Sequence, residues 1–268
     1  MTTLTAPKRS TPASARAAAG NRQRAFGRLL GTELRLFVRE PLALFWGVLF
    51  PLVLLIVLGI ATSKKPQHSL GDVKFIVAYT PVLMVFTLTI LALNGLPSVL
   101  ASYREKGYLR RLSTTPIGAW RLLAAQIVLN FAVSAVAVVL IAAIARIAFG
   151  VPLPDQAAGF VLAMVLGAAA MLGLGTLISA IAPSQRVAGL VGSLLFFPMM
   201  FFAGLWVPRA EMGSVLRHVS DFTPLGALVA AVQQTIAGHW PGTAHLLVLV
   251  AWALILCVAA GRLFRWES

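Results

Sequence analysis

The sequence predicts an all-α, polytopic membrane protein with six transmembrane helices, on the basis of its composition and the lengths of its apolar runs. Of its 268 residues, 59% are hydrophobic and 11% are charged, and the mean hydropathy is +0.88. An ordinary soluble domain carries about 25% charged residues. A bilayer-spanning helix needs roughly 20 apolar residues, and six runs reach that length. They are residues 43–61, 75–99, 122–149, 157–182, 187–206 and 243–261.

The basic residues predict the orientation of these spans. The chain has 22 Lys and Arg against 8 Asp and Glu, and the charges flank the apolar runs instead of covering one soluble face. Nucleic acid is therefore not an expected partner. With the N-terminus inside, sixteen basic residues fall on the cytoplasmic side and six on the other. The positive-inside rule then predicts that both termini are cytoplasmic.

Ahead of the first span, residues 1–21 predict a disordered basic tail, and residues 22–40 predict an amphipathic helix lying in the membrane interface. Residues 1–25 lack the apolar centre of a cleavable signal peptide. In residues 22–40, at about 100° per residue, apolar and basic side chains occupy opposite faces. The apolar face holds Phe26, Leu30, Leu34 and Phe37, and the basic face holds Arg24, Arg28, Arg35 and Arg39.

Two glutamates, Glu33 and Glu40, interrupt the apolar face of this interfacial helix. A carboxylate facing acyl chains is costly. One interpretation is that this face meets protein, where a glutamate pairs with a nearby basic or hydroxyl group. The other is that both side chains extend to water at the shallow interface.

The polar stretch between the second and third runs is the most informative part of the chain. Its pattern predicts a short helix over residues 103–116, followed by a Ser-Thr-Thr-Pro stop. A simple connection between spans needs only a few polar residues, so a specific role is one hypothesis and a positively charged topology anchor is the other. The residues singled out are Tyr103, Arg104, Glu105, Lys106, Gly107, Arg110, Arg111 and Pro116.

Small residues and a short apolar stretch predict how the second half packs. In the fourth run, Gly159, Ala163 and Gly167 repeat every four residues, which allows close approach of neighbouring helix backbones. Between the fifth and sixth runs, the apolar residues 225–237 are too few to span a bilayer. Two short helices that dip back into the outer leaflet are therefore expected, because a seventh span would place the C-terminal arginines outside.

The motifs of an autonomous enzyme are missing from the sequence. No lysine follows a glycine, so there is no phosphate-binding P-loop, and neither HExxH, GxSxG nor a cluster of acids for a metal is present. We therefore predict no catalytic residue, no metal and no cofactor in this chain. The middles of the spans also lack the ionisable residues of a proton-coupled carrier.

Aromatic residues concentrate in the first, second and fifth runs. A cleft lined by rings and a few amides suits a planar amphipathic molecule, whereas the alternative for each ring is ordinary packing between helices or across a dimer. Of the fifth-run rings, Phe197 and Phe201 share one helical face and are the preferred contacts. The predicted path residues are Phe45, Trp46, Phe50, Phe86, Asn94, Phe197 and Phe201.

Two segments resemble the permeases of ABC-2 type transporters, in particular the daunorubicin-resistance type of antibiotic efflux permease. Residues 104–116 are similar to the pattern R-E-x-G-x-L-x-x-L-x-x-x-P, and residues 197–208 to F-P-x-x-F-x-S-G-x-x-x-P. The resemblance covers about residues 22–265 and makes residues 22–268 one transmembrane domain.

This resemblance implies a transport subunit of the bacterial cytoplasmic membrane that has no ATPase site of its own. Its expected partners are a separate P-loop ATPase that binds ATP and Mg, a second permease copy (a homodimer, with a heterodimer possible), membrane lipids and a small amphipathic substrate. The segment 103–116 would then couple to the ATPase, whereas Glu33, Arg35, Arg39 and Glu40 are the residues singled out in the interfacial helix. Alternative functions are export of a cell-envelope lipid or glycan, or ATP-independent transport as a carrier or channel.

Overall fold

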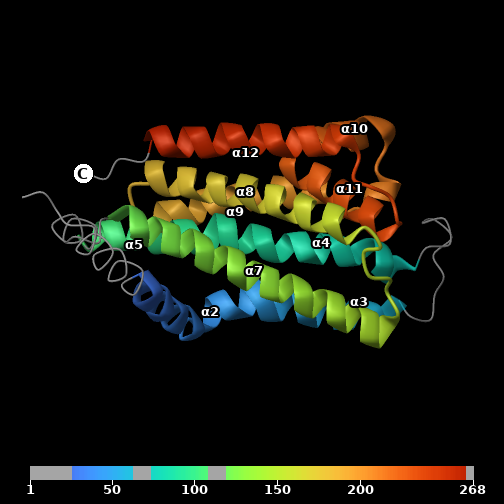
Figure 1. The fold of residues 1–268 in the computed structure, drawn as a ribbon, viewed down its shortest axis with the longest axis horizontal. Coiled ribbons are helices and arrows are strands. Elements are labelled where there is room, and N and C mark those ends of the chain that lie inside the picture. Colours follow the sequence, from blue (N-terminus) through green and yellow to red (C-terminus); the bar gives the residue numbers. More distant parts are fainter. Residues whose placement is uncertain (1–25, 63–73, 108–118, 264–268) are drawn as a thin grey trace, which may run out of the picture.

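A computed structural model describes residues 26–62, 74–107 and 119–263, so the predicted tail at 1–21 lies outside the described residues. Within the described residues the regular elements are helical, and six helices are long and apolar enough to cross a membrane, as predicted. They run along the long axis of one bundle (Figure 1). The six spans are Pro41–Thr62, Phe75–Glu105, Trp120–Phe149, Ala157–Ile181, Gln185–Ala203 and Thr243–Leu263.

The first two spans are each interrupted by a π-helical turn. The first consists of α2 (Pro41–Leu44), the π-turn η1 (Phe45–Leu49) and α3 (Phe50–Thr62), and the second of α4 (Phe75–Ile90), the π-turn η3 (Leu91–Gly95) and α5 (Leu96–Glu105). The remaining spans are α7 (Ala119–Phe149), α8 (Ala157–Ile181), α9 (Gln185–Ala203) and α12 (Thr243–Leu263). Because π-turns widen a helix locally and often occur at functional sites, their position in the bundle bears on function.

The two ends of the bundle differ in what they carry. A helix over residues 26–38 precedes the first span and lies at the same end as the C-terminus of α5 and the C-terminus of α12 (Figure 1). We call this the α5 end. The opposite end carries two short helices, α10 (Ser214–Phe222) and α11 (Pro224–Ile236), and we call it the hairpin end.

The two helices at the hairpin end confirm the predicted re-entrant element. A bend of 99° separates α10 from α11. The bend forms because Thr223 leaves the helical conformation, and its hydroxyl then accepts a hydrogen bond from the backbone N–H of Gly226 at 3.1 Å, capping α11. Most of α11 is buried among α4, α8, α9 and α12, which explains why a helix too short to span a bilayer is nonetheless apolar.

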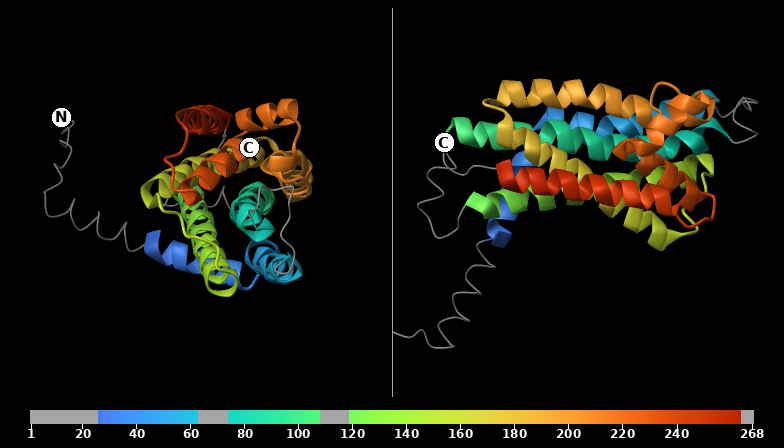
Figure 2. Two further views of the ribbon diagram at one scale, coloured as in Figure 1. Left: turned by 90° about the vertical axis from the view of Figure 1, so that its right-hand side faces the viewer. Right: turned by 90° about the horizontal axis from the view of Figure 1, so that it is seen from above.

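The second span lies at the centre of the bundle. Of its most apolar 18-residue window, 83% is buried, against 17–61% for the other five spans. The view along the bundle axis shows α4 between the other helices (Figure 2). Its neighbours reach it through glycines: a Cβ added to Gly175 of α8 would lie 2.0 Å from the carbonyl oxygen of Ala92, and one added to Gly192 of α9 would lie 2.0 Å from that of Leu93. Both carbonyls belong to η3, so backbone packs on backbone there.

The glycines of the fourth run allow the close helix packing that their spacing predicts. A Cβ on Gly167 would lie 2.4 Å from the Leu228 side chain of α11, and one on Gly159 would lie 2.6 Å from Pro241. The small face of α8 is therefore filled by α11 and by Pro241, which precedes the last span.

The prediction of a separate short helix starting at Tyr103 is wrong. Tyr103, Arg104 and Glu105 form the last turn of α5, which continues the second span without a break. Gly107 has a positive φ of 66°, the left-handed conformation that ends many helices because glycine adopts it without steric cost. Residues 108–118 lie outside the described residues.

We predict that Gly175→Ala destabilises the permease, because the added methyl group cannot occupy the position of a backbone oxygen and must push α8 away from η3. Overpacking of this kind costs about 1–3 kcal/mol, which should appear as a lower melting temperature in size-exclusion chromatography of the heated, detergent-purified protein. Gly261→Ala is the matched control, because a Cβ there meets no atom within 4 Å. Equal melting temperatures for the two variants would contradict close backbone packing at η3.

Candidate functional site

At the α5 end, one buried carboxylate joins three segments of the chain. The Glu33 side chain is 5% exposed, and its Oε2 accepts hydrogen bonds from the hydroxyl of Tyr103 in α5 at 2.9 Å and from Nε2 of Gln126 in α7 at 2.7 Å. Leu29 and Tyr103 pack beside them against Leu122 of α7. The interpretation that Glu33 faces protein and meets a hydroxyl group is therefore the one that the structure supports.

The environment of Glu33 acts on its ionisation in two opposing ways. Burial raises the pKa of Glu33 above its ordinary value, because desolvation disfavours the charged form, and the hydrogen bonds from Tyr103 and Gln126 lower it by a smaller amount. A raised pKa means that the ionised carboxylate is less stable in the folded protein than in the unfolded chain.

Glu40, the second glutamate of this segment, behaves differently. It is exposed at the break between the helix over residues 26–38 and α2, as are the arginines Arg35 and Arg39. Extension of the Glu40 side chain to water at the membrane interface stays a prediction.

Two predicted coupling residues cap the turn between α8 and α9. Arg104 donates from Nη1 to the carbonyl oxygen of Ala180 at 3.4 Å and from Nη2 to that of Ala182, at the C-terminus of α8. Glu105 accepts a hydrogen bond at Oε1 from the backbone N–H of Gln185, the first residue of α9, at 3.1 Å. A cation at a helix C-terminus and an anion at a helix N-terminus are each favourable.

Only some of the other predicted coupling residues lie within the described part of the chain. Lys106 is exposed just beyond α5 and next to Gly107, whereas Arg110, Arg111 and Pro116 lie outside the described residues. The role of this segment in coupling stays a prediction. Because Arg104 and Glu105 also cap neighbouring helices, a substitution at either residue would change the fold of this end as well as its charge.

A cleft of about 790 Å³ opens along the first, second and fifth spans. Both π-turns border it: Trp46 and Gly47 come from η1, and Leu91, Asn94 and Gly95 from η3. The local widening of both helices therefore coincides with this cleft.

A continuous series of ring contacts forms the aromatic side of this cleft. Centroid distances along the series are 4.9 Å for Trp46–Phe50, 5.5 Å for Phe50–Phe86, 5.4 Å for Phe86–Phe196, 5.8 Å for Phe196–Phe197 and 5.9 Å for Phe197–Trp206. The rings differ in exposure. Phe86 and Phe196 are buried in helix packing, whereas Trp46, Phe197 and Trp206 are 45%, 61% and 49% exposed.

Of the seven predicted path residues, the structure brings five to the cleft. Trp46, Phe50, Phe86, Asn94 and Phe197 line it. Two do not: Phe45 packs edge-on against Trp46 at 5.1 Å, and Phe201 packs against Phe202 at 5.6 Å. Between the two preferred contacts, the geometry therefore favours Phe197.

Polar residues of the third span also line the cleft, and the sequence reasoning missed them. Gln126 and Asn130 are 2% and 4% exposed. Nearer the fifth span, the hydroxyl of Ser193 donates to Oδ1 of Asn94 at 3.0 Å. The missed signal was present in the sequence, because Gln126, Asn130 and Ser134 recur every four residues inside an apolar run. Gln126 both lines the cleft and donates to Glu33, so it lies between the cleft and the α5 end.

Comparison with known proteins adds two findings. Residues 24–237 match the profile of a family described as "ABC-2 type transporter". Two relatives, from Escherichia coli strain K12 and Escherichia coli O157:H7, are both described as a probable multidrug ABC transporter permease, YbhR. Each is 24% identical to this chain over 161 residues, which is 57% of this chain and 43% of the relative. The match thus spans less than half the length of these relatives.

We predict that Glu33→Gln flattens the pH dependence of stability, whereas Glu33→Ala destabilises the protein. The raised pKa means that stability is greatest below the ordinary pKa of glutamate and is lost as pH rises through the higher folded-state value. Glutamine keeps an acceptor for both donors without the charge. Alanine removes the acceptor of the buried Gln126 amide and of the half-buried Tyr103 hydroxyl, at a cost of about 1–3 kcal/mol.

Melting temperatures of the detergent-purified protein between about pH 5 and about pH 8 measure both effects. Glu40→Gln is the control, because it removes an exposed carboxylate from the same segment. If Glu33→Gln kept the slope of the wild type, ionisation of Glu33 would have no part in the stability of this end.

Proposed function

The chain belongs to the ABC-2 type transporter family, and from that premise we propose that it exports a hydrophobic or amphipathic molecule with energy from a separate ATPase subunit. Membership in this family makes it the membrane subunit of a transporter, and such subunits pair with an ABC ATPase. The relatives described as multidrug permeases favour a drug-like cargo. The ATP and Mg would be held by the partner ATPase.

The observation that carries the proposal is the aromatic cleft. Three exposed rings, Trp46, Phe197 and Trp206, line a cavity of about 790 Å³ that is also lined by the amides of Asn94, Gln126 and Asn130. Exposed rings stack on planar apolar groups, and a few amides orient a polar substituent. This combination suits a planar amphipathic molecule.

A second permease copy would complete the cleft. Leu190, Leu194 and Phe197 form one strongly exposed stripe of α9 beside the cleft. In a dimer, identical stripes would face each other across the cleft and exclude lipid from it. We propose a homodimer of this chain. A heterodimer with a related permease could place the same two helix faces against each other.

The ATPase would dock at the α5 end, and this end would face the cytoplasm of a bacterium. The exposed Lys106 and the arginines Arg35 and Arg39 lie there, and basic residues favour the cytoplasmic side. Glu33 links the helix over residues 26–38 to α5 and α7, so displacement of α5 by the ATPase would be transmitted to Gln126 at the cleft.

We predict opposite labelling of cysteines placed at the two ends. In a Cys257→Ser background, which removes the single native cysteine, Ser214→Cys at the hairpin end should react with an impermeant maleimide added to intact cells. Lys106→Cys at the α5 end should react only after the membrane is permeabilised. The reverse pattern would place the α5 end outside and exclude docking of a cytoplasmic ATPase there.

We predict that Phe197→Ala weakens ATP-dependent transport of a planar amphipathic compound. The assay measures daunorubicin fluorescence in inverted membrane vesicles that contain the permease and its ATPase. Loss of one ring contact is worth about 0.5–1.5 kcal/mol, so the apparent KM should rise by roughly two- to tenfold. Phe201→Ala is the matched control, since it removes the same ring from the same helix outside the cleft.

Three outcomes would contradict the proposal: two concern the cargo path and one concerns the energy source. Equal transport by wild type and Phe197→Ala, with normal amounts of assembled complex, would place the cargo path elsewhere. A larger loss in Phe201→Ala than in Phe197→Ala would do the same. Transport that persists without ATP would identify a carrier or channel.

A further inference from the structure

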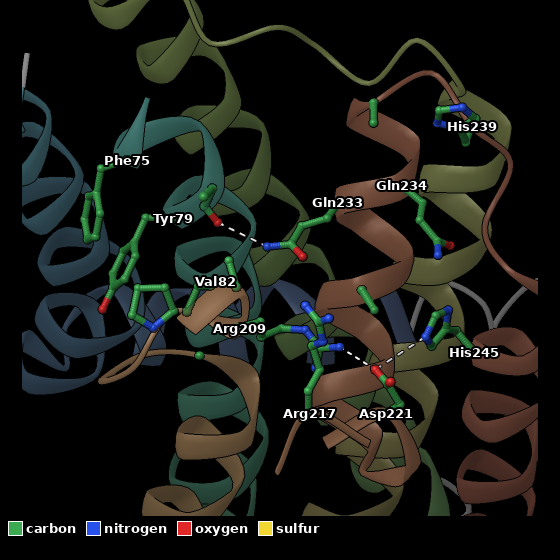
Figure 3. Close-up of a pocket in the computed structure, with 16 residues that line it drawn as sticks. Phe75, Tyr79, Val82, Arg209, Arg217, Asp221, Gln233, Gln234, His239 and His245 are labelled. Atoms are coloured by element: carbon green, nitrogen blue, oxygen red, sulfur yellow. Dashed lines mark hydrogen bonds and ion pairs between the residues drawn. The ribbon is translucent and has the colours of Figure 1, made fainter. Parts of the chain in front are cut away.

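A second cavity, of about 450 Å³, lies at the hairpin end (Figure 3). Its walls come from the start of α4, the residues between α9 and α10, the two hairpin helices and the start of α12. It is distinct from the aromatic cleft, although Tyr79 of α4 borders both cavities.

One side of this cavity is rich in hydrogen-bond donors that carry positive charge or can acquire it. Two guanidinium groups, of Arg209 and Arg217, and two imidazoles, of His239 and His245, line it, and Asp221 supplies the one carboxylate among its lining residues. Figure 3 shows Arg209, Arg217, Asp221 and His245 close together, with His239 further away, beyond Gln234. With both imidazoles neutral, the lining carries one net positive charge.

Arg209 and Asp221 neutralise each other and hold the hairpin in place. Arg209 is 7% exposed, and its guanidinium donates to the hydroxyl of Ser220 and to a carboxylate oxygen of Asp221. The Ser220 hydroxyl in turn donates to the carbonyl oxygen of Phe202, at the end of α9, at 2.6 Å. This pair is structural, and it leaves the charge of Arg217 uncompensated within the cavity.

Two nitrogen-bearing groups of the cavity lack a partner within the described part of the chain. Arg217 is exposed, lines the cavity and forms no ion pair there. His245 places Nε2 3.5 Å from Asp221, while its Nδ1 is buried and forms no hydrogen bond with any described residue. A buried ring nitrogen without a partner is costly, so a bound group that pairs with it would be stabilised.

The opposite side of the cavity is apolar and lies near the membrane boundary. Phe75, Tyr79 and Val82 occupy the first two turns of the second span and face the charged groups across the cavity. Figure 3 shows Phe75 and Tyr79 on the side away from Arg217 and His245. Phe75 is the first residue of the second span, so a lipid headgroup at the end of this span would lie beside the cavity.

We propose that this cavity binds the phosphate oxyanion of an amphipathic molecule. Arg217 supplies the charge, His239 supplies a further donor, and His245 donates from Nδ1 when its ring is protonated there. The side formed by Phe75 and Tyr79 receives the apolar part that follows the phosphate. Guanidinium groups bind phosphate through paired N–H donors. The proposal stands apart from the export function, because binding at the hairpin end needs neither the ATPase nor the cargo.

The test is binding to the purified full-length permease by native mass spectrometry. The probes are dioctanoyl phosphatidylglycerol, dioctanoylglycerol, which lacks the phosphate, and inorganic phosphate as a competitor. Arg217→Gln removes an exposed charge and is expected to fold normally. The loss of hydrogen bonds between charged groups should weaken phosphatidylglycerol binding by about tenfold.

Arg146→Gln is the matched control, because it removes an exposed arginine from the last turn of α7, outside the cavity. His239→Gln provides a second variant, with a smaller loss expected.

Each outcome decides the proposal. Weaker binding in Arg217→Gln but not in Arg146→Gln supports it. In that case, displacement by inorganic phosphate identifies a free anion as a sufficient ligand, and the absence of displacement identifies a lipid headgroup. Equal affinity of wild type, Arg217→Gln and His239→Gln for phosphatidylglycerol would overturn it. Binding of dioctanoylglycerol as tight as that of phosphatidylglycerol would also overturn it, because the cavity would then recognise only the apolar part.

Discussion

Two backbone carbonyls of the second span, those of Ala92 and Leu93, lie against Gly175 of α8 and Gly192 of α9 with no side chain between them. This contact sets how closely the fourth and fifth spans approach the central helix. The carbonyls are in the π-turn η3, which also borders the cleft. The spacing of the bundle and the shape of the cleft therefore depend on the same turn. Packing in a membrane cannot rely on the hydrophobic effect between helices, so such close backbone contacts are a main source of its stability.

The polar residues of the interior form a path from the α5 end toward the cleft. Gln126 donates to Glu33 and lines the cleft, and the side chain of Asn130, one turn further along α7, donates to the carbonyl oxygen of Gln126 at 2.8 Å. Buried polar groups are stable only when their hydrogen bonds are made. A displacement of α5 that separates Tyr103 from Glu33 would break one of the two hydrogen bonds to this buried carboxylate. The network thus connects the α5 end with the cleft through hydrogen bonds.

The sequence predicted which types of residue form the candidate site, but not which of these residues contact one another. The aromatic residues of three runs and the presence of Glu33 on an apolar face were visible in the sequence. The partner of Glu33, the capping roles of Arg104 and Glu105, and the choice of Phe197 over Phe201 were not. Each of these depends on contacts between residues far apart in the chain. The separate helix expected over residues 103–116 was wrong because helical spacing does not show that Gly107 adopts a positive φ.

The sequence by itself determined the class of this protein: six spans, a re-entrant hairpin and an amphipathic helix before the first span. These follow from the length, periodicity and charge of single segments, which the bilayer constrains directly. Only the tertiary structure decided which helix lies at the centre, where the cleft opens, and which charges are neutralised. Arg209 illustrates the difference, because its sequence position indicated a basic residue in a loop, whereas in the fold it is buried and paired with Asp221. The energy of a charge depends on its surroundings, and distant parts of the chain supply them.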